Sequence, residues 1–523
     1  MKSQSNPLKV EFGDFQTPLG LAREVCHVVE RFGFKPRSVL EPTCGTGSFI
    51  QAAIESFPKL TAIIGNEINP QYAAVARSSA SSMPGHMRPH IIENDFFTFD
   101  FEGLISQIPD PMLILGNPPW VTNSGLGVLK SSNLPIKSNI NSLRGIEALT
   151  GASNFDISEW ILRKCLTLLS DRNGLLAVLC KTAVARKVLN FAWSAKYPVI
   201  SASTYRIDAA KYFNAAVDAC LLIIQMGQGS KSYDCHEFES LTAWSPRNRS
   251  GFREGHLVAN IDFFEKWNHL RALEPGGWRS GIKHDCSKVF ELERVGVSYY
   301  NGLTELVSVE ASTLYPILKS SDLASHRQPR RWLLIPQKSM SDNPCKLKQE
   351  SPKAWDYLMR HADLIDKRGS SIYKNRPRFS IFGIGNYSFA PWKVAISGLY
   401  KKLEFSAWGL FESLPIMVDD TCYFYPSRNK EECDLLEKLM KSDPAQEYLS
   451  AFVFWDSKRP ITSGLLNSLD LAKLGRILDY RGSVFRSLTD RQVIKYDTEL
   501  QQTLLFREKS EPYHSKRNRA RPI

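Results

Sequence analysis

Residues 111–120 read PMLILGNPPW, an apolar run that is followed by a rigid turn. The run has the length and composition of a buried β-strand. Each proline of the turn fixes its own φ and restricts the residue before it, so the chain leaves the strand in an extended form. Such a turn presents the Asn117 amide, the Pro118 carbonyl and the Trp120 ring in a fixed arrangement that suits a flat ring with an amine. An Asn-Pro turn alone is common in loops, so the residues upstream carry the argument.

This strand belongs to a series within residues 1–230, where apolar strand-like runs alternate with helical patterns. The alternation predicts an α/β fold with a doubly wound, Rossmann-like, mostly parallel sheet. The expected strands are 38–41, 60–66, 90–93, 112–116, 174–180 and 219–226, and the expected helices include 21–31, 49–56, 71–79 and 158–169. Ligands of such sheets bind beyond the carboxyl ends of the strands, which is where the motifs of this chain fall.

A polar linker, residues 227–232 (GQGSKS), ends the alternation. A chain of 523 residues is too long for one ordinary core. We therefore expect one domain over residues 1–230 and a second, mixed α+β domain over residues 231–523 that ends in a basic tail.

Composition limits the class of protein. No apolar run approaches 18 residues and the N-terminus lacks the apolar core of a signal peptide, so the sequence predicts a cytoplasmic protein. The ten cysteines form no CxxC pair, which fits a reducing compartment, and we expect no metal. The formal net charge of +12 suits a polyanionic partner.

The segment EPTCGTGSF, residues 41–49, follows the first expected strand and opens a helix. Gly45 and Gly47 let the backbone turn sharply and approach a ligand with no Cβ in the way. The acidic Glu41 would repel a diphosphate and favour a cationic ammonium or sulfonium group. The segment therefore favours S-adenosylmethionine over a dinucleotide.

Two further strand ends carry polar residues. Glu67 ends the second strand, where a carboxylate can accept from both hydroxyls of a ribose, although it could also be an ordinary acidic residue at a helix start. Asp95 ends the third strand, where it could accept from an adenine amino group or only cap the next turn. Each residue alone is ambiguous, but four successive strand ends with such motifs are not.

Together with Phe15-Gln16-Thr17-Pro18, these motifs resemble those of the S-adenosylmethionine-dependent N6-adenine DNA methyltransferases. The resemblance is to the group whose cofactor motifs precede the catalytic motif and whose target-recognition region is C-terminal. It covers roughly residues 10–230, including a weaker match at residues 213–226.

The resemblance implies roles for individual residues. Thr17 would meet the methionine carboxylate, and Glu67 would hold the ribose. The full set of cofactor-binding residues would be Thr17, Glu41, Thr43, Gly45, Glu67, Ile68, Asp95 and Phe96. The catalytic residues would be Asn117, Pro118, Trp120 and Phe213, with two acceptors for the target N6 amine and two rings for the flipped base. Trp120 departs from the tyrosine that is commonest in this family, but it keeps a ring face.

A basic region follows in the second half, where residues 322–378 contain 13 Lys/Arg against 6 Asp/Glu. Basic residues mostly contact phosphates, and arginines in the major groove can also read guanine. A solvated basic face is the alternative reading. The candidate DNA-binding residues are Arg330, Arg331, Lys374, Arg376 and Arg378.

The resemblance implies double-stranded DNA as partner, a cognate restriction endonuclease as functional companion, and action as a monomer. Two alternatives stay open at this point. One is a methyltransferase that acts on RNA or on protein glutamine, and the other is a non-catalytic nucleic-acid-binding module on the same fold.

Overall fold

The computed structural model describes residues 16–81, 88–121, 156–274 and 276–489. The chain divides into two compact units. The first comprises Met1–His269 and Glu447–Pro460, and the second comprises Leu270–Gln446 and Ile461–Ile523. Phe15 and the basic tail lie outside the described residues.

The expected division at residue 230 is too early. Three strands after the polar linker join the sheet of the first unit, and they are β8 (Asp234–Phe238), β9 (Asn248–Arg253) and β10 (His256–Val258). β8 pairs in parallel with β6 (Val199–Ile207), so the sheet continues where the alternation of strands and helices stops. The linker is a connection within the sheet, and composition alone could not separate it from a domain boundary.

The first unit contains a ten-stranded sheet in the order β10-β9-β8-β6-β7-β5-β4-β1-β2-β3. Five neighbouring strands of this sheet are parallel, in the order β5-β4-β1-β2-β3. β7 is antiparallel to both of its neighbours, β5 and β6. Their bounds are β1 (Ser38–Glu41), β2 (Ala62–Glu67), β3 (His90–Glu93), β4 (Met112–Gly116), β5 (Gly174–Lys181) and β7 (Ala219–Met226). All six expected strands are thereby confirmed, and β6 (VISASTYRI) was missed because small polar residues interrupt its apolar pattern.

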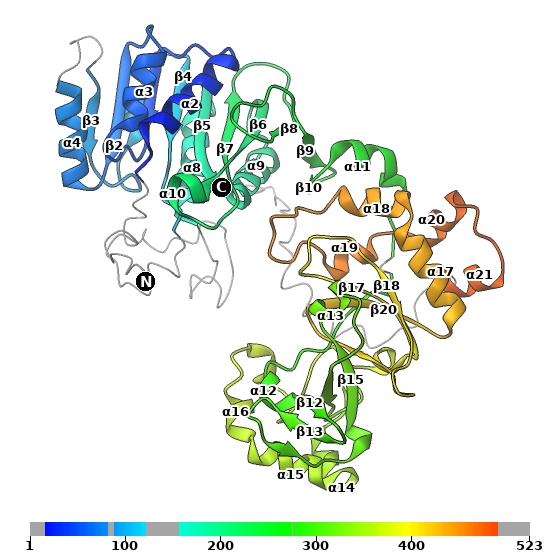
Figure 1. The fold of residues 1–523 in the computed structure, drawn as a ribbon. Coiled ribbons are helices and arrows are strands. Elements are labelled where there is room, and N and C mark those ends of the chain that lie inside the picture. The colour runs from blue at the N-terminus through cyan, green and yellow to red at the C-terminus, as the bar shows by residue number, and fades with distance from the viewer. Residues whose placement is uncertain (1–15, 82–87, 122–155, 275, 490–523) are drawn as a thin grey trace, which may run out of the picture. The chain divides into compact units, whose positions relative to one another are not determined.

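Helices cover both faces of this sheet, as Figure 1 shows. Alternate residues of the central strands, such as Val39 and Leu40 of β1, point into two separate buried cores. One core includes residues of α2 (Leu19–Arg31), α3 (Ser48–Ser56) and α4 (Pro70–Ser81). The other includes residues of α5 (Phe101–Ile105), α8 (Ile157–Leu169) and α9 (Thr182–Ser194). The doubly wound α/β prediction is confirmed. Two further helices of this unit are α10 (Ala209–Phe213) and α11 (Ile261–Trp267).

The strand order reverses between β1 and β4, because β2 and β3 lie on one side of β1 and β4 and β5 on the other. Open α/β sheets bind ligands at such a switch point, beyond the carboxyl ends of the strands. The Gly45 turn follows β1 and the Asn117 turn follows β4, so the topology brings both motifs to this point.

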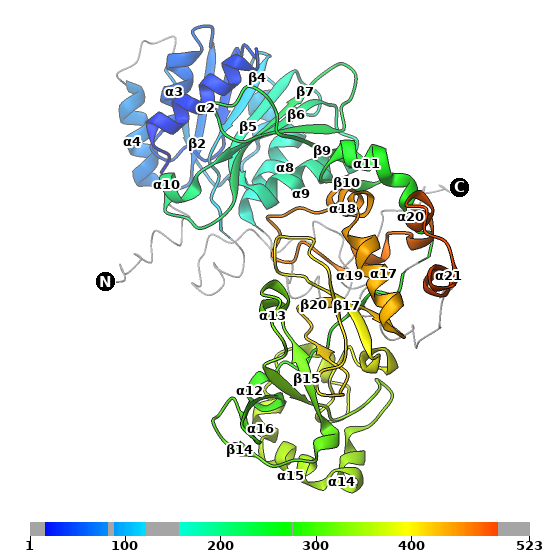
Figure 2. The ribbon, with the colours of Figure 1, turned by 45° about the vertical axis from the view of Figure 1, so that its right-hand side comes forward.

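The second unit has a mixed α+β structure with two sheets. A four-stranded antiparallel sheet has the order β11-β20-β17-β18, and a six-stranded sheet has the order β14-β13-β12-β16-β15-β19. Helix α17 (Lys430–Lys441) lies against β17, β18 and β20 (Figure 2). The strands are β11 (Arg279–Ser280), β12 (Glu291–Val295), β13 (Ser298–Asn301), β14 (Leu306–Val307), β15 (Leu314–Leu318), β16 (Arg331–Leu334), β17 (Trp392–Ser397), β18 (Ser406–Trp408), β19 (Met417–Val418) and β20 (Cys422–Ser427).

The other helices of the second unit are short. They are α12 (Ser287–Phe290), α13 (Ser320–Ala324), α14 (Leu347–Glu350), α15 (Pro352–Arg360), α16 (Ala362–Asp366), α19 (Ser463–Asn467), α20 (Leu471–Ile477) and α21 (Ser483–Thr489), while the division between the two units falls within α18 (Asp443–Ser450). Among the described residues, no helix has the length and apolar character needed to cross a lipid bilayer.

Candidate active site

Gln16 and Glu67 close the glycine turn between β1 and α3. Gly45 and Gly47 have φ values of +52° and +90°, a left-handed conformation that favours glycine. The Gly45 N–H donates to the Glu67 carboxylate at 2.8 Å, and the Thr46 N–H donates to Gln16 Oε1 at 3.2 Å. A Cβ at Gly45 would lie 2.7 Å from the same Gln16 oxygen. Gln16 was not among the expected site residues, although it stands next to Thr17 in the matching motif.

Glu41 is a buried carboxyl at the end of β1, with 2% of its surface exposed. Burial raises the pKa of this carboxyl well above its usual range, and the nearby Glu67 charge raises it further. Glu41 Oε2 and the hydroxyl of Thr43 are both buried and have no hydrogen-bond partner among the residues that the structure describes. Buried polar atoms normally have partners, so this place suits a ligand that brings a positive charge and donors.

Glu67 is fixed in orientation at the end of β2. Its two carboxylate oxygens accept from the N–H groups of Gly45 and Asn69, each at 2.8 Å. The next residue, Ile68, is 42% exposed, which is unusual for a large apolar side chain. The end of β2 therefore offers a carboxylate beside an exposed apolar surface.

Asp95 and Phe96, the two expected residues after β3, have different surroundings. Asp95 is half-buried, and its Oδ1 accepts from the N–H of Phe97 at 2.9 Å, so the side chain caps the turn. Phe96 is 3% exposed and packs in the core, with its ring centroid 4.9 Å from that of Phe101. The Phe96 carbonyl accepts from Lys164 Nζ at 2.8 Å, so both the ring and the carbonyl of Phe96 have partners within the protein.

The turn after β4 contacts the segment before α2. Asn117 Nδ2 donates to the hydroxyl oxygen of Thr17 at 3.2 Å, which joins two residues far apart in the sequence. A Cβ at Gly116, the last residue of β4, would lie 3.3 Å from Cγ of Glu41. The expected catalytic turn and the expected methionine-binding end are therefore direct neighbours.

Trp120 and Phe213 form an aromatic pair. Their ring centroids are 5.2 Å apart with an interplanar angle of 73°, and each side chain is 7% exposed. The indole N–H of Trp120 donates to the carbonyl of Leu179 in β5 at 3.4 Å. The two rings that the sequence assigned to the target base are thus in contact, and Phe213 covers part of Trp120.

Lys181, the last residue of β5, contacts the turn after β4 and was not among the expected site residues. Its ammonium donates to the carbonyl of Trp120 at 2.9 Å and to the carboxylate of Asp156 at 2.7 Å. Asp156 in turn caps α8 by accepting from Ser158 N–H at 3.1 Å. The position of Lys181 after an expected strand was the available signal, but its partner carbonyl could not be read from the sequence.

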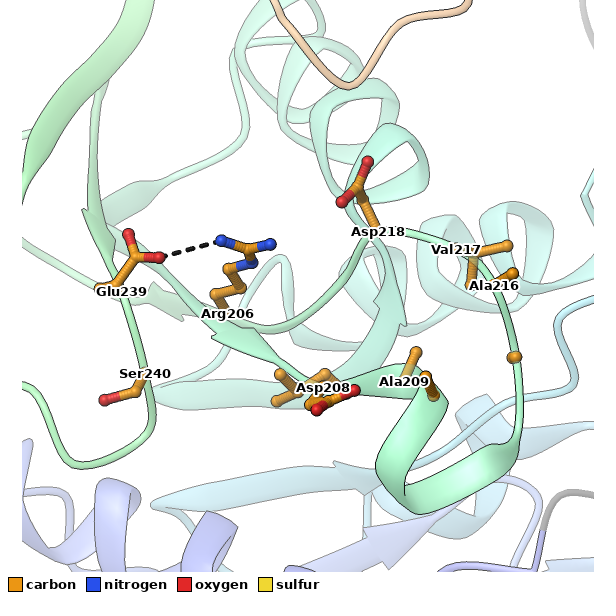
Figure 3. A pocket seen from close by; sticks show the side chains of 11 residues that line it. Arg206, Asp208, Ala209, Ala216, Val217, Asp218, Glu239 and Ser240 are labelled. Carbon is orange, nitrogen blue, oxygen red and sulfur yellow. Dashed lines mark hydrogen bonds and ion pairs between the residues drawn. The ribbon is translucent and has the colours of Figure 1, made fainter.

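A cavity of about 580 Å³ opens at the end of β6 (Figure 3). One wall is α10, which ends at Phe213, with the loop that follows it. Across the cavity, Arg206 and Glu239 form an ion pair with an N···O distance of 3.0 Å. The lining residues are Arg206, Ile207, Asp208, Ala209, Ala210, Ala215, Ala216, Val217, Asp218, Glu239 and Ser240. None of these residues belongs to the glycine turn, and none was among the residues expected to bind the cofactor.

No family model matches the chain. The chain is 42% identical to the type II methyltransferase M.NspV of a Nostoc species over 473 residues, which are 90% of this chain and 98% of that protein. The chain belongs to the type II methyltransferases. This methyltransferase is also 32% identical to M.CvrRI of Paramecium bursaria Chlorella virus XZ-6E over 184 residues, or 35% of this chain and 40% of that protein.

Among solved structures, the methyltransferase resembles the type IIL restriction-modification enzyme MmeI, determined in complex with DNA. The TM-score is 0.50 at 14% identity, and the match covers 95% of this chain and 72% of MmeI. This similarity concerns the fold. The predicted Rossmann-like methyltransferase fold is thereby confirmed, and the identity to M.NspV shows that the chain is a DNA methyltransferase.

The five candidate DNA-binding residues differ in their surroundings. Three arginines of the second unit pair with carboxylates, namely Arg330 with Asp322, Arg331 with Glu291 and Arg378 with Asp366. For Lys374 and Arg376, the described part of the chain contains no carboxylate within ion-pair distance. The side chain of Lys374 is exposed, and the Arg376 guanidinium lies 5.9 Å from the ring centroid of Phe382.

Arg331 is exposed and pairs with a carboxylate of a buried charge cluster. His284, Glu291 and Asp419 bring ligand-type atoms within 4.8 Å of one another. Lys319 Nζ lies 2.7 Å from Glu291 and 3.8 Å from Asp419, so a lysine already balances these carboxylates. Although burial raises the pKa of Glu291, hydrogen bonds from His284, Lys319 and Arg331 lower it to about 2. The cluster acts as an internal ion network of the second unit.

Proposed function

We propose that the methyltransferase transfers a methyl group from S-adenosylmethionine to the N6 amine of an adenine that is flipped out of double-stranded DNA. The observation that carries this proposal is the junction of Asn117 with Thr17, beside Glu41 and the Trp120–Phe213 pair. Near the switch point of the sheet, the acceptors would be the Asn117 amide and the Pro118 carbonyl. Glu41 would be the acid that meets the cation, and Trp120 and Phe213 would be the two rings.

The chain fits the cofactor at its methionine end and at its ribose. The buried Glu41 carboxylate suits the positive charge of the methionine moiety, and the Thr43 hydroxyl and the Gly45 turn lie beside it. Thr17 accepts from Asn117 through its oxygen, so its own O–H can be donated to a carboxylate. Glu67 suits the ribose hydroxyls and Ile68 the adenine face, while Asp95 and the backbone of Phe96 suit the adenine edge. When bound, S-adenosylmethionine supplies a methyl group on a sulfonium.

Asn117 and the Pro118 carbonyl would act on the target amine. The lone pair of an adenine amine is delocalised into the ring, so the amine is a poor nucleophile. Two fixed acceptors draw this nitrogen toward a tetrahedral form and stabilise the positive charge that develops on it. Held by Asn117 and the Pro118 carbonyl, the amine nitrogen would take the methyl group, the C–S electron pair would stay with sulfur, and one amine proton would be released.

The hydrogen bond to Thr17 prepares Asn117 for this role. Because Nδ2 donates to Thr17, the carbonyl end of the amide is turned away from Thr17. Positioning and orientation of this kind can supply about 7–11 kcal/mol of a reaction barrier. Trp120 would stack on the flipped base, which is worth about 1–3 kcal/mol per base, against a flipping cost of a few kcal/mol. Phe213, which meets Trp120 at an interplanar angle of 73°, would contact the base from another side.

The second unit would recognise the DNA, with Lys374 and Arg376 as phosphate contacts and Arg330, Arg331 and Arg378 as further candidates. We expect the methyltransferase to act as a monomer in the cytoplasm, together with a separate endonuclease of the same specificity. The relationship to the type II methyltransferases supports DNA over RNA as acceptor, and the basic region suits a nucleic acid better than a protein. The glycine turn with its buried Glu41 argues against a non-catalytic module, because such a module has little use for a cofactor site.

The test is transfer of labelled methyl groups from S-adenosylmethionine to unmethylated plasmid DNA, with RNA and bulk protein as parallel acceptors. We expect label in N6-methyladenine. We expect Asn117→Ala to abolish transfer but to retain cofactor binding by calorimetry, since Asn117 would act on the base. Label in cytosine, RNA or protein would refute the proposed acceptor, and a near-wild-type rate for Asn117→Ala would refute the proposed mechanism.

A further inference from the structure

We infer that Lys181 is a positioning residue for the methyl transfer, which fixes the Asn117–Trp120 turn through its last carbonyl. This inference rests on the proposed function of that turn. Lys181 itself touches neither the expected cofactor residues nor the Asn117 amide in the contacts that the structure records.

The turn depends on an external donor because of its own sequence. Pro118 and Pro119 have no N–H, so two consecutive residues cannot anchor the turn by donating hydrogen bonds. The turn is left with the N–H groups of Asn117 and Trp120, its carbonyl acceptors and its side chains. Lys181 Nζ donates to the Trp120 carbonyl at 2.9 Å, and the Trp120 ring donates to the Leu179 carbonyl at 3.4 Å. Both anchors come from the end of β5.

The anchor is itself fixed at its far side. Lys181 Nζ also lies 2.7 Å from Asp156, whose side chain is 7% exposed. Asp156 Oδ1 accepts from the N–H of Ser158 at 3.1 Å and from its hydroxyl at 2.5 Å, so the carboxylate is part of the α8 cap. The next residue, Ile157, donates its N–H to the Val121 carbonyl at 3.0 Å. Lys181 thus connects the Asn117–Trp120 turn to the start of α8, through a carboxylate that the helix cap holds in place.

The ammonium is suited to this position by its charge and its donors. An ammonium has three N–H donors, and two of them meet the acceptors on Trp120 and Asp156. A hydrogen bond from a charged donor is shorter and stronger than one between neutral groups. Lys181→Met keeps the length of the side chain and removes both bonds, while Lys181→Arg keeps the charge and the donors.

The test compares three variants of the full chain. Lys181→Met and Lys181→Arg are set against Lys187→Met, a matched control that removes another lysine–carboxylate pair to α8, that of Lys187 with Glu159 at 3.1 Å. The readouts are the single-turnover transfer rate, the dissociation constant of S-adenosylmethionine, and 2-aminopurine fluorescence at the target adenine. Circular dichroism and the Tm report on folding.

We expect Lys181→Met to slow transfer by about 10- to 100-fold, because a displacement of about 1 Å at a catalytic group can cost as much as 100-fold. Its affinity for S-adenosylmethionine should stay within about twofold of wild type, its 2-aminopurine signal should change, and Lys181→Arg should regain most of the rate. Lys187→Met should react at the wild-type rate.

A Lys181→Met enzyme with a wild-type rate would overturn the inference. So would an equal loss of rate in Lys187→Met, or a loss of cofactor binding and Tm that accounts for the slower transfer, since these indicate a general structural role. A wild-type enzyme that methylates no adenine would instead refute the proposed function, so the two failures are distinguishable.

Discussion

Lys393 of β17 is a lysine in the core of the second unit, and it should make the stability of this methyltransferase depend on pH. The residue is 2% exposed, and its ammonium donates to the Ala390 carbonyl at 2.5 Å and lies 5.9 Å from the ring centroid of Phe424. Burial lowers the pKa of Lys393 to about 7. The perturbation is Lys393→Met, which replaces the ammonium with an apolar side chain of similar length.

The sign follows from the protons that each state binds. Between pH 7 and the ordinary lysine pKa of about 10.4, the unfolded chain holds a proton at Lys393 that the folded chain has lost. Stability therefore rises with pH in this range. Each pH unit at a difference of one proton is worth about 1.4 kcal/mol, so an increase from pH 6.5 to 8.5 stabilises the wild type by about 2 kcal/mol.

The assay is urea denaturation at pH 6.5, 7.5 and 8.5, analysed as the difference between wild type and Lys393→Met. The difference removes the contributions of other groups, such as the buried cysteines, whose raised pKa values act in the opposite direction above about pH 8.5. Lys393→Met should be the more stable protein at pH 6.5, and its advantage should shrink by about 2 kcal/mol at pH 8.5. Lys402→Met, at an exposed lysine, is the control. A difference that does not vary with pH would refute the reasoning.

Two further predictions concern the cofactor and the DNA. Because the pKa of the buried Glu41 is raised and a cationic ligand favours the carboxylate, cofactor binding should release up to one proton at pH values below that raised pKa. Calorimetry in buffers of different ionisation enthalpy measures this release, which Glu41→Gln should eliminate, and a release unchanged in that variant would contradict the assignment. Lys374→Ala with Arg376→Ala should reduce the slope of log K against log[salt] by about 1.8, since each phosphate contact contributes about 0.9. Arg378→Ala alone should change it less, because Arg378 already pairs with Asp366; the reverse order would contradict this interpretation.

The sequence predicted the sheet of the first unit well because its central strands are buried on both faces. Runs such as residues 112–116 and 174–180 are continuously apolar, and the strands formed there. β6 was not predicted because small polar residues interrupt its apolar residues. No helix lies between β8, β9 and β10, so the strand–helix alternation stops before them and the expected domain boundary fell too early.

The sequence by itself determined which residues stand at the strand ends, because a parallel sheet places all carboxyl ends at one edge. Gly45, Glu67, Asp95 and Asn117 follow from that rule. Which side chains touch was decided only by the tertiary structure. These contacts join residues from separate elements. They include the hydrogen bond from Asn117 to Thr17 and the hydrogen bond from Lys181 to the Trp120 carbonyl. They also include the ion pairs of three of the five candidate DNA-binding residues. Such contacts cannot be predicted from the local sequence, because they depend on how the elements pack against one another.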